Sequence, residues 1–431
     1  MTKSWRQCLI FLVFTLNECL GFEKYYDGHV VLQVIPKNSL QFEALRKLNE
    51  ALGFEFDFWK HSNRVDKPAD IMIPEEKLDE VQGYLKKNNL DAKTKVIDVG
   101  RLIRKEEEIL ESHESSSRLR SMPSFNLYDY HTYDDQMAYI KSIAQQYSYV
   151  HLESLGKSVE GRDIQYLKIG YPSNRPKNIL FIDAGIHARE WIAPATAICI
   201  IDRLVTNPDY TSLLYDIDIY VVPNVNPDGY EYSRTSDRMW RKNRSGPRQG
   251  CYGVDLNRNF AFKWGYSGVS RDPCSETYAG SSALSEVEAQ HLAKILDANN
   301  NTIKAYVTLH SYGEDLIYPW GYAIRTYPSD VAELKKLAHE AAEAIHAVNG
   351  TRYSVGNSAD ELYPASGASD DYSKSIGIKF VYTFELSPTS SDDNFYGYGF
   401  QFPKEFIQPT CEETFPGILT IAKAVQDTNS K

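Results

Sequence analysis

Hydrophobic and polar positions change period several times between residues 29 and 98. Stretches in which apolar residues alternate with polar ones, or form short apolar runs, predict strands, and apolar residues at helical spacing predict helices. The predicted elements are strands at 29–35, 54–59, 69–73 and 94–99 and helices at 39–52 and 75–89. Their order, β-α-β-β-α-β, is the ferredoxin-like pattern. Nothing in this unit resembles a catalytic cluster, so we interpret it as a folding aid, a plug or an interaction module.

A charged helical stretch follows at 101–114 and ends in the polar segment 115–120, Ser-Ser-Ser-Arg-Leu-Arg. A serine-rich tip that carries Arg118 and Arg120 is a natural site of proteolytic cutting. An ordinary linker explains the same composition equally well.

Beyond Pro123, near-continuous apolar strands alternate with helical stretches. Strands of this kind are buried on both faces, which implies a sheet covered by helices on either side. We therefore expect one α/β domain over 119–431. Its clearest predicted elements are strands at 178–183, 218–223, 305–310 and 379–384 and helices at 193–205 and 285–298.

The length of 431 residues suggests two domains. The chain has 47 basic and 58 acidic residues and a formal net charge of -11. This balance argues against a nucleic-acid or anionic-membrane partner, because either would call for a basic face.

The first 21 residues have the pattern of an export signal. Lys3 and Arg6 give a positive start, residues 8–16 form an apolar run, and Cys19 and Gly21 are small residues near a cleavage point. A membrane anchor is the alternative, but such a short apolar run cannot span a bilayer. No later segment reaches spanning length, so we expect a secreted, soluble protein.

In a secreted protein, the cysteines can form disulfides and three N-glycosylation sequons can be modified. Cys251 and Cys274 close a polar loop and can form a disulfide in an oxidising compartment. Cys199 and Cys411 either pair or remain buried as small hydrophobic residues. The sequons begin at Asn243, Asn300 and Asn349.

Candidate polar residues follow the predicted strands of the α/β domain, where ligands bind in sheets of this kind. His187 and Glu190 follow the first of these strands, His310 ends the third, and Glu385 follows the fourth. A lone histidine is more often a surface or hydrogen-bonded core residue than a ligand. Two imidazoles and one carboxylate, however, leave one position of tetrahedral zinc open, as a catalytic site requires. Further polar residues follow the second strand at Asn224, Asn226 and Asp228.

Seven segments in a fixed order carry a family resemblance, namely GIHAREW, NPDGY, RMWRKNRS, GVDLNRNF, PCSETYAG, TLHSY and YTFEL. They resemble the zinc metallocarboxypeptidases of the pancreatic A/B type, over essentially all of 119–431. The upstream unit is similar to the propeptide of that family. The resemblance implies a mixed, mostly parallel sheet sandwiched by helices, preceded by a small ferredoxin-like α+β domain. It divides the chain into a signal peptide (1–21), an activation propeptide (22–118) and a zinc carboxypeptidase catalytic domain (119–431).

The same resemblance implies roles for individual residues. His187, Glu190 and His310 match the ligands of one zinc ion, and Glu385 matches the general base that acts on the zinc-bound water. Arg241 matches the arginine that stabilises the oxyanion. Asp255 matches the acid that orients His187. The implied substrate-binding residues are Arg189, Arg238, Asn257, Arg258, Tyr312 and Tyr363.

Several of these residues have ordinary alternatives. Arg238 and Arg241 lie in a run that by itself would be a solvated basic loop, Tyr363 is one of 30 tyrosines, and Asp255 is a plausible turn residue. The family pattern favours the functional interpretation.

Asp370, in the segment SGASDDYS, stands where B-type enzymes carry an acid and A-type enzymes an apolar residue. A buried carboxylate is costly unless a cation pairs with it, so we predict removal of C-terminal lysine or arginine. Ser358 and Leu362 match the walls of the pocket. The alternative is that Asp370 points to solvent beside Asp371.

We therefore expect a secreted zymogen that a trypsin-like protease cuts after Arg118 or Arg120. Its partners are peptide or protein substrates with a free C-terminus and proteinaceous carboxypeptidase inhibitors, and nothing demands more than a monomer. The loop 387–394 is longer and more acidic than the family pattern. The competing hypotheses are an A-like enzyme for aromatic or aliphatic residues and a non-catalytic peptide-binding protein.

Overall fold

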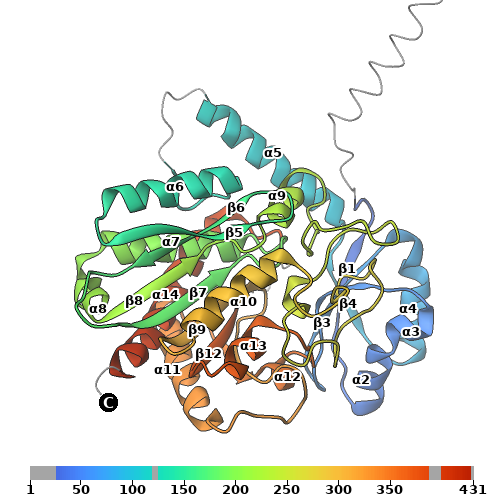
Figure 1. The fold of residues 1–431 in the computed structure, drawn as a ribbon. Coiled ribbons are helices and arrows are strands. Elements are labelled where there is room, and N and C mark those ends of the chain that lie inside the picture. Colours follow the sequence, from blue (N-terminus) through green and yellow to red (C-terminus); the bar gives the residue numbers. More distant parts are fainter. Residues whose placement is uncertain (1–25, 119–124, 388–398, 429–431) are drawn as a thin grey trace, which may run out of the picture.

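The computed structural model describes residues 26–118, 125–387 and 399–428 (Figure 1). The export signal, Arg120 and most of the atypical loop lie outside these ranges. The predictions for them therefore remain predictions.

The N-terminal unit is a four-stranded sheet in the order β2-β3-β1-β4, covered by helices. All of its strand pairs are antiparallel, and β1 lies between β3 and β4. This arrangement confirms the ferredoxin-like prediction. Its elements are β1 (Val30–Val34), α2 (Ser39–Arg46), α3 (Leu48–Leu52), β2 (Asp57–Lys60), β3 (Ala69–Ile73), η1 (Glu75–Lys77), α4 (Leu78–Lys87) and β4 (Ala92–Val96).

Three boundaries differ from the sequence prediction. The helix expected at 39–52 divides at Lys47, and its second part ends at Gly53, whose φ of 59° favours glycine. The strand expected at 54–59 begins only at Asp57; the backbone N–H of Phe56 donates instead to the side chain of Asn49. The last strand, at Ala92–Val96, begins two residues and ends three residues earlier than expected.

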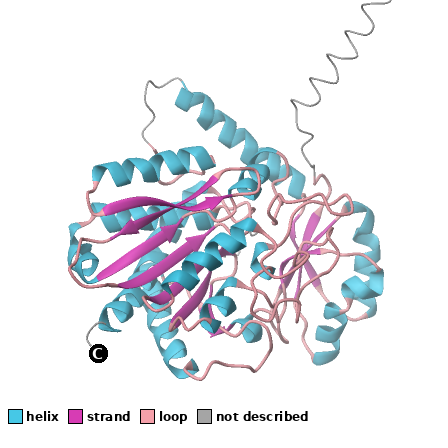
Figure 2. Cartoon of the chain, viewed as in Figure 1, coloured by secondary structure: helices cyan, strands magenta, loops and turns pink. Residues whose placement is uncertain are grey.

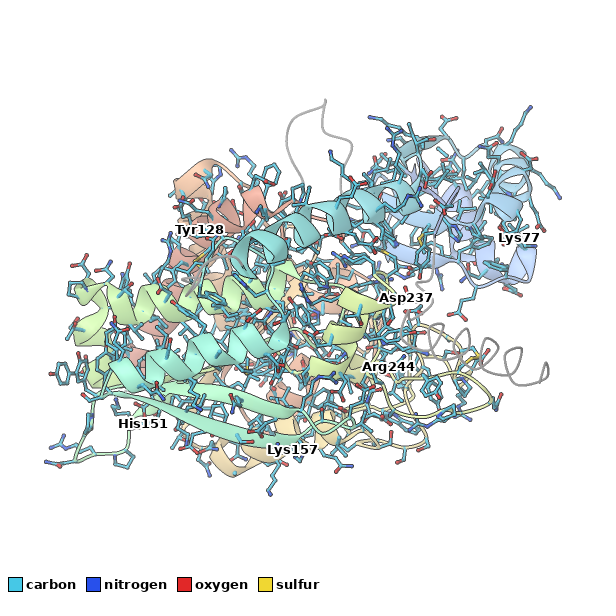
Figure 3. All side chains as sticks on the ribbon, turned by 90° about the horizontal axis from the view of Figure 1, so that it is seen from above. Lys77, Tyr128, His151, Lys157, Asp237 and Arg244 are labelled. Atoms are coloured by element: carbon cyan, nitrogen blue, oxygen red, sulfur yellow. A yellow bond between two sulfur atoms is a disulfide. The ribbon has the colours of Figure 1, made fainter. Side chains whose placement is uncertain are left out.

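Helix α5 (Val99–Arg118) connects the two domains (Figure 1). Seen from above, it crosses over the C-terminal domain (Figure 3), and Glu106 on it forms an ion pair with Arg238. The structure therefore places Arg118 at the end of a helix rather than in a free linker.

The C-terminal domain is built on an eight-stranded mixed sheet in the order β11-β10-β12-β9-β7-β8-β6-β5. The pairs β7–β8, β7–β9, β9–β12 and β10–β11 are parallel, and the remaining three are antiparallel. The mixed, mostly parallel sheet is confirmed. The strands are β5 (Val150–Lys157), β6 (Asp163–Ile169), β7 (Asn178–Ala184), β8 (Ile217–Val222), β9 (Ile303–Ser311), β10 (Asp315–Tyr318), β11 (Ser354–Asn357) and β12 (Phe380–Leu386).

Helices cover both faces of this sheet, and each face has its own apolar core. Helices α6, α7, α11 and α14 pack over one face, and α10 and α13 over the other (Figure 1). The longer helices are α6 (Tyr133–Gln146), α7 (Ile192–Thr206), α10 (Val287–Asn299), α11 (Val331–Asn349) and α14 (Ile407–Asp427). The shorter ones are η2 (Pro208–Tyr210), α8 (Thr211–Asp216), α9 (Pro227–Thr235), η3 (Leu256–Arg258), α12 (Ser358–Glu361), α13 (Ser369–Ser375) and η4 (Lys404–Phe406).

Much of the irregular chain of the C-terminal domain gathers on the side that faces the N-terminal unit (Figure 2). The central strands β7, β9 and β12 end toward these loops. Within the described ranges, no helix is long and apolar enough to cross a membrane.

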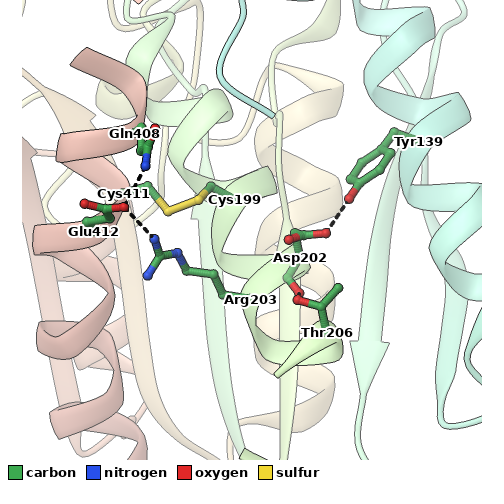
Figure 4. Close-up of a disulfide and its surroundings, with 8 residues drawn as sticks. All are labelled: Tyr139, Cys199, Asp202, Arg203, Thr206, Gln408, Cys411 and Glu412. Atoms are coloured by element: carbon green, nitrogen blue, oxygen red, sulfur yellow. Dashed lines mark hydrogen bonds and ion pairs between the residues drawn. A yellow bond between two sulfur atoms is a disulfide. The ribbon is translucent and has the colours of Figure 1, made fainter. Parts of the chain in front are cut away.

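Two disulfides cross-link the C-terminal domain. Cys251 pairs with Cys274, as predicted. Cys199 on α7 pairs with Cys411 on α14, which decides the alternative that the sequence left open (Figure 4). Next to it, Arg203 forms an ion pair with Glu412 across the same two helices.

Candidate active site

The polar residues predicted at the strand ends meet at one edge of the sheet. Glu385 on β12 lies opposite His310 on β9, because the two strands are parallel and paired in that register. Strand β7, on the other side of β9, leads directly into the turn that carries His187 and Glu190.

His187, Glu190 and His310 form a buried cluster. Nδ1 of His187 lies 2.7 Å from Oε1 of Glu190, Nδ1 of His310 lies 3.1 Å from Oε2 of Glu190, and the two Nδ1 atoms are 3.1 Å apart. Bonds of about 2.0–2.1 Å to a tetrahedral zinc ion separate its ligands by ~3.3 Å. The donor set and its spacing therefore fit zinc.

The protonation states of the three groups depend on one another, and His310 must lose its proton when a metal ion binds. Burial works against the charge on Glu190, but the adjacent histidines outweigh it and keep the pKa of Glu190 well below its usual range. Burial also opposes protonation of His310, yet Glu190 raises its pKa to about 9. Burial and Arg241 lower the pKa of His187. An acid that stays ionised between two imidazoles is suited to a divalent cation.

Asp255 connects this cluster to Arg241. It is fully buried; Oδ1 lies 3.2 Å from Nε2 of His187, and Oδ2 accepts hydrogen bonds of 3.1 and 3.0 Å from Nε and Nη2 of Arg241. Its place is fixed locally, because its side chain also caps η3 by accepting from the backbone N–H of Asn257. The carboxylate thus orients the ring of His187 with Nδ1 toward the cluster.

The predicted carboxylate-binding residues lie beside this group. Arg258 donates from Nη2 to the hydroxyl of Tyr363 at 2.8 Å and from Nη1 to the carbonyl of Asn257. The Asn257 side chain accepts from the backbone N–H of Ser369, at the start of α13. Both residues line the same cavity as the metal cluster.

Asp370 lies in the wall of this cavity and has only 4% of its surface exposed. Its Oδ2 accepts from Ser358 Oγ at 3.1 Å and from Thr383 Oγ1 at 3.4 Å, and its Oδ1 accepts from the backbone N–H of Asp371. Asp371 instead accepts from the N–H groups of Gly321 and Tyr322. The alternative that Asp370 points to solvent is wrong.

Comparison with known proteins agrees with this geometry. Residues 136–417 match the family model described as zinc carboxypeptidase, and residues 32–106 match that of the carboxypeptidase activation peptide. The chain belongs to the zinc carboxypeptidase family. This membership makes the protein zinc-dependent, with an N-terminal activation peptide.

The relatives of this zinc carboxypeptidase include both specificity types. Carboxypeptidase B of Astacus astacus is 45% identical over 307 residues, covering 70% of this chain and 98% of the relative. Carboxypeptidase A4 of Mus musculus is 36% identical over 94% of this chain and 96% of its own length. The solved carboxypeptidase A from Helicoverpa armigera has a TM-score of 0.86 at 30% identity, covering 95% of this chain and all of that one.

In this zinc carboxypeptidase, the activation peptide covers the cavity. The cavity is lined by Phe58, Trp59 and Lys60 of β2 and by His61, which follows this strand, together with the metal cluster. The ring of His61 lies 4.3 Å from that of Tyr363, centroid to centroid. Access to the site from this side is therefore blocked by the chain itself.

Three residues expected to contact substrate are instead bound to carboxylates of the activation peptide. Arg189 pairs with Asp57, Arg238 with Glu106, and the hydroxyl of Tyr312 donates to Asp70 at 3.0 Å. The structure thus places these residues at the interface with the activation peptide, beside the cavity.

The sequence analysis missed the residues of the activation peptide that enter the site. The only local signal was the alternation of aromatic and polar residues in 54–59, which we interpreted as a strand of the small unit. Phe400, which lines the cavity from near the C-terminus, carried no signal either.

Several polar residues are structural. Asn226 caps α9, and Asp228 accepts from Ser158 and Arg162. Asn224 is fully buried and is not among the residues that line the cavity. Asn243 is fully buried and donates from Nδ2 to Glu286 and Glu288, so its sequon cannot carry a glycan in the folded protein.

Proposed function

We propose that this carboxypeptidase zymogen becomes, after removal of its propeptide, an exopeptidase that prefers C-terminal lysine or arginine. The observation that carries the preference is the buried Asp370 carboxylate. In the described parts of the chain it accepts three hydrogen bonds but has no ion pair with a cation. A lysine or arginine side chain in the cavity would supply the missing charge, whereas an apolar one would leave it unpaired.

The proposed binding mode follows from the positions of the other groups. Arg258 and Asn257 hold the terminal carboxylate of the substrate, for which the planar guanidinium offers two parallel donors. Tyr363, already hydrogen-bonded to Arg258, covers the bound residue. Ser358 and Leu362 line the walls, and the small Ser358 leaves room for a long side chain.

The proposed catalytic residues surround the metal cluster. Zinc held by His187, Glu190 and His310 would supply a water of lowered pKa and polarise the scissile carbonyl. The Glu385 carboxylate accepts a proton from the attacking water and then donates it to the leaving amine. Arg241 places a fixed positive charge where the oxyanion develops, held in place by Asp255.

The remaining parts of the proposal concern processing and partners. We propose that residues 1–21 direct secretion, that 22–118 are removed by a trypsin-like protease cutting after Arg118 or Arg120, and that 119–431 act as a monomer on peptides. Proteinaceous inhibitors are further expected partners. In support, bovine thrombin-activatable fibrinolysis inhibitor, 38% identical over 70% of this chain, has been solved with a tick carboxypeptidase inhibitor.

A paired assay tests the proposal. The zymogen is treated briefly with trypsin, and release of C-terminal arginine, lysine and phenylalanine is compared with and without a zinc chelator. We expect chelator-sensitive release of the two basic residues. Release of phenylalanine instead would favour the A-like alternative, with which the similarity to carboxypeptidase A4 also agrees. No release from processed, zinc-loaded protein would favour a non-catalytic binding protein.

A further inference from the structure

Asn226, which follows β8, is fully buried, and both ends of its side-chain amide are hydrogen-bonded. Its Oδ1 accepts the backbone N–H of Gly229 at 3.0 Å and so caps α9. Its Nδ2 donates to two backbone carbonyls, that of Ile186 at 3.2 Å and that of Lys242 at 3.1 Å. Capping the helix requires only the oxygen, so the two bonds from the nitrogen serve another purpose.

The two carbonyls lie next to residues of the proposed reaction site. Ile186 directly precedes His187, one of the three clustered metal-ligand candidates, and Lys242 directly follows Arg241. One amide nitrogen therefore joins the turn that carries a metal ligand to the turn that carries the oxyanion-stabilising arginine. Because peptide units are planar and rigid, fixing these carbonyls also fixes the backbone from which the two side chains extend.

The same two turns are in direct contact beside Asn226. The backbone N–H of Ala188 donates to the carbonyl of Arg241 at 3.0 Å. A Cβ atom on Gly229 would lie 2.5 Å from Nδ2 of Asn226 and 2.5 Å from the carbonyl oxygen of Lys242, so only glycine fits at that position. The junction is therefore tightly packed, and a change at the Asn226 side chain is passed on to the two turns.

We propose that Asn226 is a positioning residue that sets the place of His187 relative to Arg241. Asp255 links the side chains of these two residues, and Asn226 links their backbones. The inference rests on the proposed function, because it takes the metal and the guanidinium to stabilise the same oxyanion. A displacement of about 1 Å between such groups lowers a reaction rate by roughly 10²-fold.

Two substitutions separate the role of the nitrogen from that of the oxygen. Asn226→Asp preserves size and the helix cap but places an acceptor against two carbonyl oxygens. Asn226→Ser also preserves the cap and is too short to bond both carbonyls. Asn207→Asp is the matched control. Asn207 caps η2 by accepting the N–H of Asp209 at 2.9 Å, and it follows the last residue of α7, whereas the active-site turn precedes the first.

The kinetic test uses the trypsin-processed enzyme and a peptide that ends in arginine. We expect kcat to fall roughly 10²-fold in Asn226→Asp and about tenfold in Asn226→Ser. KM should stay within about twofold, because the terminal carboxylate lies on Arg258, which belongs to a different turn. A peptide phosphonate, which imitates the tetrahedral anion, should lose affinity in proportion to kcat/KM, while free arginine should bind as before. Asn207→Asp should match the unmodified enzyme.

Metal retention gives a readout that does not depend on turnover. Transfer of zinc to a chelator should be about tenfold faster from Asn226→Asp, because the turn that carries His187 is less firmly held. In the unmodified enzyme, removal of zinc should speed hydrogen exchange in residues 224–230 as well as in 184–190, since the Asn226 side chain couples the two segments.

The outcomes separate this inference from the proposed function. If folded Asn226→Asp keeps the kcat of the unmodified enzyme, or if kcat, KM and the affinity for arginine all worsen alike, the inference is overturned and the proposed function stands. Where a thermal melt shows that Asn226→Asp does not fold, Asn226→Ser decides in the same way. If neither variant folds, hydrogen exchange in 224–230 that does not respond to zinc removal overturns the inference. If the unmodified enzyme cleaves no peptide, the proposed function fails, and zinc transfer and hydrogen exchange still test the role of Asn226.

Discussion

Replacing Asp370 by asparagine removes one charge from the cavity while preserving size and most hydrogen bonds. The carboxylate is almost fully buried, so the positive side chain of a substrate pairs with it out of contact with bulk water. Loss of one partner of a buried pair costs about 3–5 kcal/mol. We therefore expect kcat/KM for a C-terminal arginine peptide to fall by roughly 10²- to 10⁴-fold.

The assay compares C-terminal arginine and phenylalanine peptides with the processed enzyme. Phenylalanine release should stay constant or rise in Asp370→Asn, because the cost of leaving a carboxylate unpaired disappears. Asp371→Asn is the matched control: its carboxylate holds the backbone of Gly321 and Tyr322, so both rates should change together. If Asp370→Asn lowers both rates equally, or changes neither, our account of the pocket is refuted.

Three further predictions concern catalysis, the propeptide and the fold. Glu385→Gln should lower peptide release at least 10³-fold while bound zinc, measured by metal analysis, stays near one per chain, because Glu385 is outside the ligand cluster. Burial, with Arg258 and Arg241 close by, lowers the pKa of His61 from 6.5 to about 4, so propeptide docking should weaken as the pH falls through that range. Allowing for partial exposure of His61, we expect docking to weaken by roughly 2 kcal/mol, seen as faster hydrogen exchange in β2 of the zymogen at acid pH than in His61→Gln at the same pH. Replacing Cys199 and Cys411 by serine should lower the free energy of unfolding by ~3–5 kcal/mol in a denaturant melt, because their bond spans 212 residues; an unchanged midpoint would contradict this.

Local pattern predicted the elements of the fold well where burial is simple. The central strands at 178–183 and 305–310 are near-continuously apolar and appear within a residue or two of their predicted bounds, as β7 and β9. The helix predicted at 39–52 was wrong in detail, because it divides at Lys47, and the strand predicted at 54–59 begins only at Asp57. The periodicity of apolar residues indicates which face of a helix or strand is buried. It does not indicate where packing against a neighbouring element shortens or divides that helix or strand.

The sequence by itself determined which residue types stand at the strand ends and in what order. Two histidines and a glutamate after apolar strands indicated a zinc site before any contact was known, because the carboxyl ends of such strands meet at one edge. The family resemblance then added the expected roles of Glu385, of Arg241 and of Asp370 in the pocket.

Only the tertiary structure decided which of these groups meet and what covers them. The pairing of Cys199 with Cys411, the burial of Asn243 and the occupation of Arg189 by Asp57 all join residues far apart in the chain. Such contacts depend on how strands pair and domains dock, and no local period or spacing records them. The charge of the cleft in the zymogen, and the charge exposed when the propeptide leaves, follow from that docking alone.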